Sequence, residues 1–196
     1  MSRISNDQID VFDDAARLAS QKGLTRFTRF LDPAQAIQAA QIAHTYQAGF
    51  SVWGGYPDAE RVIGCFHPKE EEVSHDDYPL VCLRTKTSSK FNSISHRDLL
   101  GAYMALGLTR ACIGDIIISG SAVFIFSSLQ TSEFVAASLT SAGKVSLDFS
   151  VLDETPVIPA PAGTVFSAVV SSLRLDAVVA AAYKLSRSES AECIRA

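Results

Sequence analysis

Helical and strand periodicities alternate along this chain of 196 residues and predict an α+β fold. Hydrophobic residues make up 47% of the sequence and charged residues 19%, a balance typical of a folded chain that needs no disulfide or metal to hold its core. The segment 80–151 gives strand and helix signals in the order β-α-β-β-α-β, the split βαβ order of ferredoxin-like and RRM-like domains. We therefore predict an N-terminal α/β subdomain followed by a ferredoxin-like middle domain.

The first 75 residues predict a subdomain of two helices and three strands. Ser5 or Asn6 provides an N-cap for the first helix, and Gly23 provides its stop. Asp32 followed by Pro33 is typical of the N-cap and first residue of a second helix. The predicted elements are a helix over 7–22, a strand over 25–30, a helix over 33–47, strands over 50–53 and 61–67, and an exposed acidic loop over 68–79.

The middle domain, predicted for residues 79–153, has the most regular pattern of the chain. Ser95 opens its first helix with the spacing of a capping box that ends at Asp98. Gly120 and Ser121 are the two residues between its second and third strands, a length typical of a tight hairpin. In chain order, the predicted elements cover 80–87, 95–106, 115–119, 122–127, 131–141 and 144–151.

The rest of the chain predicts a linker and a pair of helices. Residues 154–171 are rich in proline at first and then predict a strand over 164–171. Ser186 and Glu189 have the capping-box spacing that opens a helix. Within 172–196 the two short helices are predicted over 174–183 and from 187 onward.

The sequence also indicates the cellular compartment. The four cysteines are far apart and form no CxxC motif, which disfavours a zinc site or a secreted disulfide framework. The acidic N-terminus contains no apolar signal sequence. Two charge-free runs, 116–132 and 155–173, are interrupted by glycine, serine or proline, so neither predicts a membrane span. We expect a cytoplasmic protein with no membrane partner.

One basic segment stands out in an acidic chain. The net charge of −4 disfavours nucleic acid, whose binding depends on neutralising phosphates. Residues 81–110 nevertheless contain five basic residues against Asp98 alone, and these are Arg84, Lys86, Lys90, Arg97 and Arg110. His96 and Arg97 lie at a predicted helix start, where backbone amides favour phosphate oxygen. A solvated basic face is the alternative reading of the same segment.

Motifs that resemble catalytic sequences lack the residues that the chemistry needs. HRDL at 96–99 resembles a kinase catalytic loop, but Tyr103 occupies the position of the metal-binding asparagine. His67 and His75 lack the spacing of metal ligands on a helix. Asp176 lies in an RLD sequence similar to that of pseudouridine synthases, without the continuation that they require. We therefore expect no enzyme, no metal and no cofactor.

The tail resembles the beginning of an S4 RNA-binding domain. The resemblance rests on RLD at 174–176 and LSRSESA at 185–191, with family-like spacing between them. It implies two helices that present basic side chains to structured RNA. The strand that follows in such domains is absent from this sequence, so 172–196 are expected to be the first helices of a truncated S4 domain. The residues that would contact RNA are Arg174, Lys184, Arg187, Ser188 and Arg195.

Sequence blocks along nearly the whole chain resemble the YlmH family of S4-domain proteins. In chain order they are RFTRFLDP (26–33), GGYPDAER (54–61), HRDLLGAYMALGLTR (96–110), IGDI (113–116) and LTSAG (139–143). This resemblance implies a non-enzymatic RNA-binding protein that associates with ribosomes and acts, at family level, in quality control of stalled large subunits. It also implies a link to cell-division genes and an RRM-like central domain.

We therefore expect binding of structured RNA on the large ribosomal subunit, with ribosomal RNA and tRNA as candidates and with no DNA. The third strand of the middle domain lacks the basic-glycine opening of the RRM signature, and Phe124 and Phe126 are expected in the core. Shape and phosphate recognition are therefore expected, through Arg84, Lys86, Lys90, His96, Arg97, Arg110, Arg174, Lys184, Arg187, Ser188 and Arg195. Two alternatives stay open: an RNA-modifying enzyme delivered by its S4 domain, and a protein-interaction module linked to cell division.

Overall fold

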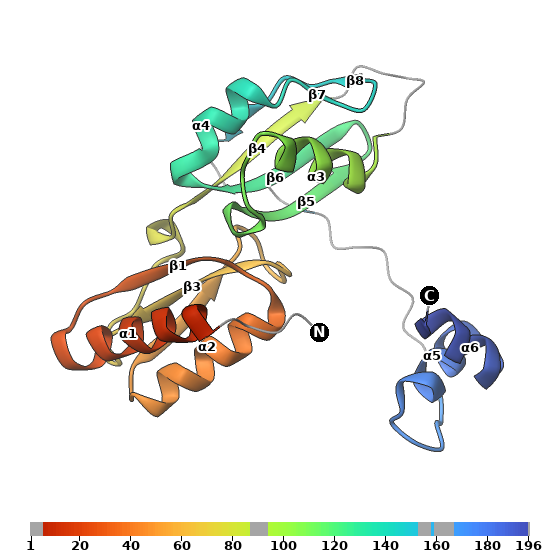
Figure 1. Cartoon of the computed structure of the whole chain (residues 1–196), viewed down its shortest axis with the longest axis horizontal. Helices are drawn as coiled ribbons and strands as arrows, with labels where there is room; N and C mark the ends of the chain where they lie inside the picture. Colours follow the sequence, from red (N-terminus) through yellow and green to blue (C-terminus); the bar gives the residue numbers. More distant parts are fainter. Residues whose placement is uncertain (1–5, 87–93, 153–157, 159–166, 196) are drawn as a thin grey trace. The chain divides into compact units, whose positions relative to one another are not determined.

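A computed structural model describes residues 6–86, 94–152, 158 and 167–195 (Figure 1). The chain forms two compact units, Met1–Ile158 and Pro159–Ala196, which we call the sheet unit and the helix-pair unit. The sheet unit combines helices with antiparallel sheets of three, four and two strands. The predicted α+β class is thereby confirmed.

The first sheet is covered on one face by two helices (Figure 1). Its strands have the order β1-β3-β2. Asp32 caps the second helix as predicted, since its carboxylate accepts a hydrogen bond from the Gln35 amide at 2.9 Å. Phe12 and Ala39 pack from the helices onto Phe66. The elements are α1 (Asn6–Lys22), β1 (Arg26–Leu31), α2 (Pro33–Thr45), β2 (Gly49–Trp53) and β3 (Val62–His67).

The second sheet has the strand order β5-β6-β4-β9, with every neighbouring pair antiparallel. Two helices, α3 and α4, cover one of its faces through Leu99, Tyr103 and Val135, which pack against Leu83 and Ile125. The elements are η1 (His75–Asp77), β4 (Leu80–Lys86), α3 (His96–Ala105), η2 (Arg110–Cys112), β5 (Ile113–Ser119), β6 (Ala122–Ser128), α4 (Leu129–Ser138), β7 (Ser141–Ala142), β8 (Val145–Ser146) and β9 (Ser150–Leu152).

Two local predictions for this sheet are confirmed. The Ser95 hydroxyl accepts from the Asp98 amide at 3.2 Å and the Asp98 carboxylate accepts from the Ser95 amide at 3.1 Å, which is the predicted capping box. Ser119 pairs with Ala122, so Gly120 and the next residue form the predicted two-residue hairpin loop.

The single strand predicted over 144–151 is wrong. The chain forms two short strands there, β8 and β9, and Leu147 and Phe149 between them are buried in the core under α3 and α4. The Leu147 amide donates to the Thr140 carbonyl at 2.8 Å, so it takes part in no long ladder. The alternating pattern therefore reports burial in the middle of the segment, and only its two ends, β8 and β9, pair with other strands. The helix predicted over 131–141 is also shifted, because α4 begins at Leu129 and ends at Ser138.

The strand predicted over 164–171 is contradicted in its described part. Residues 167–170 are in no strand, and the side chain of Val169 is fully exposed. A strand needs a neighbour to pair with. All the strands among the described residues belong to the sheet unit. The first residues of that predicted strand, 164–166, lie outside the described residues.

The helix-pair unit consists of α5 (Leu175–Tyr183) and α6 (Arg187–Arg195). The Ser190 hydroxyl is buried and donates to the Asp176 carbonyl at 2.8 Å, which fixes the two helices together. The predicted capping box at the start of α6 is confirmed, because the Ser186 amide donates to the Glu189 carboxylate at 2.8 Å and the Glu189 amide donates to the Ser186 hydroxyl at 3.2 Å.

Replacing Gly55 with alanine is expected to destabilise the sheet unit by about 2 kcal/mol. Gly55 has φ +98° and a Cβ there would overlap the Phe126 ring. Urea unfolding measures the effect. Gly101→Ala is the matched control, because Gly101 lies in α3 with nothing within 4 Å of its Cβ position, so alanine there should stabilise by about 0.5–1 kcal/mol. Equal effects of the two substitutions would contradict the prediction.

Candidate nucleic-acid interface

The face of the second sheet that α3 and α4 leave uncovered carries a cation and an aromatic ring. The register of β4 and β6 pairs Arg84 with Phe124 and Cys82 with Phe126, so these four side chains share one face. The Cζ carbon of Arg84 lies 5.8 Å from the centroid of the Phe124 ring. This cation–π pair, which we call the sheet surface, combines two groups that nucleic-acid sites use, a guanidinium and a stacking ring.

The first sheet covers the other part of this face. Phe126 is completely buried, packs in one cluster with Phe30 and Tyr78, and stacks on Tyr56 with ring centroids 5.0 Å apart. Its expected place in the core is confirmed. Phe124 packs only at the margin of the same cluster and is half-buried. The face is therefore core at one end and partly open at the other.

Arg84 has no acidic partner among the described residues. Its Nε is buried and makes no hydrogen bond to the described part of the chain. No salt bridge involves this residue among the described residues. Among the described residues, the guanidinium therefore contacts the Phe124 ring and no carboxylate.

Arg61 joins the first sheet to the second. Its Nε donates to the Ile113 carbonyl at 2.9 Å, and its Nη2 donates to the carbonyls of Phe30 at 3.3 Å and Arg110 at 3.0 Å. Burial and the nearby charge of Arg110 lower the pKa of the Arg61 guanidinium. One side chain thus satisfies three backbone acceptors from two separate segments, β1 and residues 110–113.

Asp115 of β5 also contributes hydrogen bonds to this junction, which join it to the segment 54–61. Its carboxylate accepts from the Tyr56 hydroxyl at 2.7 Å, the Glu60 amide at 2.8 Å and the Arg61 amide at 3.2 Å. Burial, followed by the hydrogen bond to Asp115, raises the pKa of Tyr56 above its ordinary value, so the phenol stays protonated as a donor. The segments 54–61 and 113–116 are thereby locked together.

The structure does not gather the predicted cations of 81–110 on one face. Arg84 lies on the helix-free face, whereas His96 and Arg97 are exposed at the start of α3, which covers the opposite face. Arg110 is half-buried at the junction, where its Nη1 makes no hydrogen bond to the described residues. Lys86 ends β4 opposite Ala122, and Lys90 lies outside the described residues.

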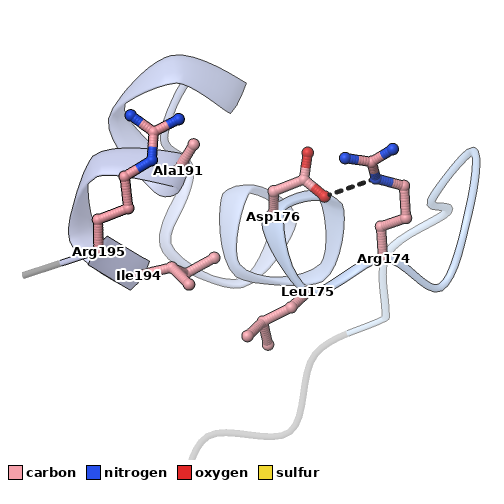
Figure 2. Close-up of a pocket in the computed structure, with 6 residues that line it drawn as sticks. All are labelled: Arg174, Leu175, Asp176, Ala191, Ile194 and Arg195. Atoms are coloured by element: carbon pink, nitrogen blue, oxygen red, sulfur yellow. Dashed lines mark hydrogen bonds and ion pairs between the residues drawn. The ribbon is translucent and has the colours of Figure 1, made fainter.

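The structure brings two cations of the tail, Arg174 and Arg187, to one carboxylate. Arg174 Nε lies 3.2 Å and Arg187 Nη2 lies 3.1 Å from the two oxygens of Asp176. Figure 2 shows Arg174 and Arg195 on either side of Asp176, along a pocket of about 430 Å³. Lys184 and Ser188 are exposed on the same helix pair, with the Ser188 hydroxyl 3.1 Å from that of Ser186. We call Arg174, Asp176, Arg187 and Arg195 the helix-pair surface.

Arg174 and Arg187 together lower the pKa of the Asp176 carboxyl. Partial desolvation raises the pKa of this carboxyl, but the hydrogen bond from Arg174 and the charges of Arg174 and Arg187 outweigh it, so the pKa lies below its ordinary value. The carboxylate is therefore ionised at neutral pH. Since two guanidinium groups share it, the group of three keeps a positive charge.

Asp176→Asn is expected to loosen the contact between α5 and α6 at neutral pH. A carboxyl whose pKa is lowered by folding stabilises the fold above its ordinary pKa of about 3.9, and this stabilisation is lost as the pH falls through the lower folded value. The amides of α6 should therefore exchange with solvent faster in the variant than in the wild type at pH 7. As the pH falls through the lowered pKa of the wild-type carboxyl, the two rates should converge. Equal rates at pH 7 would contradict the prediction.

Arg61 and Asp115 were not identified as important residues from the sequence. Their segments, 54–61 and 113–116, were recognised only as family-like blocks. Arg61 pairs with residues about fifty positions away, and no local spacing reports such contacts. The sequence does offer one signal: Arg61 and Asp115 have opposite charges and lie in two separate family-like blocks.

The described part of the chain shows neither a candidate metal site nor a candidate membrane span. No group of three or more His, Cys, Asp or Glu side chains there could hold a metal ion. No helix there is both long enough and apolar enough for a membrane span. All four cysteines are free thiols, with Cys65 and Cys82 buried, Cys112 half-buried and Cys193 exposed.

Comparison with known families places an RNA-binding domain over the second sheet. The family model described as "Putative RNA-binding domain in YlmH" matches residues 73–155. This range contains β4 to β9 and therefore the sheet surface.

A curated protein and a solved structure match most of the chain. "Ribosome-associated protein quality control protein P2" from Bacillus subtilis (strain 168) is 35% identical over 180 residues, which are 91% of this chain and 70% of that protein. The solved structure is titled "Cell division protein ylmH from Streptococcus pneumoniae". It matches with a TM-score of 0.63 at 20% identity, covering 78% of this chain and 94% of that chain, and so supports the fold alone.

Proposed function

The chain belongs to the YlmH family, and from that premise we propose that it binds structured RNA on the ribosome and catalyses no reaction. The observation that carries the proposal is the helix-pair surface, where two arginines share one carboxylate. A guanidinium held in place by a carboxylate loses less side-chain entropy when it binds a phosphate. The pair keeps donors and a positive charge for that contact.

The sheet surface supports the same proposal independently. It lies within the segment that matches the RNA-binding domain, and its cation, Arg84, forms no salt bridge with the described residues. A phosphate on Arg84 and a base edge near Phe124 would use the open part of this face. Phe126 is unavailable for RRM-type stacking, because it is in the core.

The proposal also includes the partner and the cellular compartment. We propose the large ribosomal subunit as the partner, with ribosomal RNA and tRNA as the RNA contacted, in the cytoplasm. The Bacillus subtilis relative is named as a ribosome-associated protein of protein quality control. This name supports the proposal of a role in quality control of stalled nascent chains. The names found describe RNA-binding and ribosome-associated proteins and no catalysis.

We also propose the domain layout that underlies this function. It consists of an N-terminal α/β subdomain (1–75), an RRM-like domain (79–153), a linker (154–171) and the first helices of an S4 domain (172–196). The strand order β5-β6-β4-β9, with α3 between β4 and β5 and α4 after β6, supports the RRM-like assignment.

Co-sedimentation with separated ribosomal subunits tests the proposed function. We expect the chain to migrate with the large subunit at low salt and to dissociate as salt increases, because phosphate contacts release counterions. Migration with the small subunit alone would contradict the assigned partner. No migration with either subunit at the lowest salt would overturn the proposal and favour a protein-interaction module.

A further inference from the structure

A second cavity lies within the sheet unit, away from the sheet surface. Its volume is about 290 Å³, and it is lined where β1 meets the segments around η2 and the start of α4. Ligand pockets usually range from about 300 to 1,000 Å³. This cavity is therefore of a size for a small group such as one nucleotide, and too small for a peptide helix.

A β-bulge shapes the β1 wall of the cavity. The register of β1 against β3 shifts between Phe27 and Phe30. Within the bulge, the Thr28 hydroxyl accepts from the Gly64 amide at 2.9 Å and donates to the Arg29 carbonyl at 2.7 Å, so a side chain replaces the ladder bond. Bulges of this kind redirect side chains next to functional sites. Here the redirected residues, Thr28 and Arg29, both line the cavity.

Among the described residues that line the cavity, Arg29 is the only charged one. It is exposed and makes no side-chain hydrogen bond or salt bridge to the described part of the chain. No acidic side chain is found in the lining. A lone, unpaired guanidinium in a concave site favours an anion.

The remaining lining has the mixture that a nucleotide requires. Leu108 is half-buried and contributes apolar surface against which a base could pack, Ile63 is buried in the core at the floor of the cavity, and Thr109 and Gln130 contribute polar groups. The Thr109 hydroxyl has only a long contact with the Cys112 thiol, at 3.6 Å, and makes no cap bond to η2. It is therefore available to a ligand.

We propose that this cavity binds one unstacked nucleotide of the RNA, with its phosphate on Arg29 and its base against Leu108. Proteins recognise bulges and loops of structured RNA by splaying such bases out. The inference rests on the proposed function, to which it adds a site in the sheet unit. It predicts that RNA contacts extend beyond the basic surfaces described above.

Cys112 provides a direct test, because its half-buried thiol lines the cavity. The full chain is treated with a small maleimide, and mass spectrometry follows the modification of Cys112 with and without a single-stranded hexanucleotide RNA. We expect the RNA to slow modification about fivefold or more in the wild type and in Arg26→Gln. In Arg29→Gln we expect no protection. Arg26 is the matched control, since it lies on the same strand and does not line the cavity.

Parallel arms distinguish the sources of the anion. Nucleoside monophosphates or inorganic phosphate that protect Cys112 as well as the RNA does would overturn the proposal in favour of a free-nucleotide or anion site. Protection that survives Arg29→Gln would overturn it as well. Failure of protection while the chain still migrates with the large subunit would overturn this inference and leave the proposed function standing. Failure of both would reject both.

Discussion

Arg61→Ala is expected to lower the free energy of unfolding of the sheet unit by about 3–4 kcal/mol, the largest loss that we predict for a single substitution. The change removes the donors that serve the carbonyls of Phe30, Arg110 and Ile113. A buried acceptor that loses its partner keeps the cost of its desolvation, about 1–3 kcal/mol for each group. Since Arg61 itself is half-buried at some electrostatic cost, the net loss should be smaller than the sum of the three.

Urea unfolding of the full chain measures this loss, and two further variants make it specific. Arg17→Ala is the matched control, because Arg17 forms only an exposed pair with Asp14 at 2.7 Å, and its removal should leave the free energy of unfolding nearly unchanged. Arg61→Lys should recover only part of the stability, since an ammonium cannot serve three separated carbonyls as a planar guanidinium does. If Arg61→Ala cost no more than Arg17→Ala, the junction would not be a determinant of stability.

The predictions that held are those in which cause and effect lie within one turn of helix. Asp32 with Gln35 and Ser95 with Asp98 are pairs three residues apart, so their capping bonds can be read directly from the spacing. The two-residue hairpin at Gly120 is local for the same reason. Such features depend little on what the rest of the chain does.

The predictions that failed depend on distant partners. The segment 144–151 alternates like a strand, but Leu147 and Phe149 are buried in one core with residues of α3 and α4. The local pattern carries no information about these distant helices. Charge counting found the basic segment 81–110, yet it could not show that Arg84 and Arg97 belong to opposite layers of one domain. No spacing within the strand around Arg29 reports the cavity, which Arg29 lines beside a β-bulge together with residues of distant segments.

The double substitution Arg174→Ala/Arg187→Ala is expected to weaken RNA binding roughly 10- to 100-fold at moderate salt. Each guanidinium can make a charge-assisted contact with phosphate, and together they form the centre of the helix-pair surface. Loss of two phosphate contacts should also reduce the slope of log affinity against log salt by about two. Titration of the full chain against the large subunit at several salt concentrations measures both quantities.

Two controls separate a positioned contact from net charge and from misfolding. Lys22→Ala/Lys69→Ala removes the same charge from exposed positions in the sheet unit and should leave affinity within about threefold of the wild type. Arg174→Lys/Arg187→Lys keeps both charges beside Asp176, so it should retain most of the salt slope while losing part of the affinity. If the two alanine pairs weakened binding equally, the effect would be one of overall charge, and the helix pair would have no special role. A loss confined to the arginine pair would instead place the main RNA contact on α5 and α6, since only there do two cations share one carboxylate among the described residues.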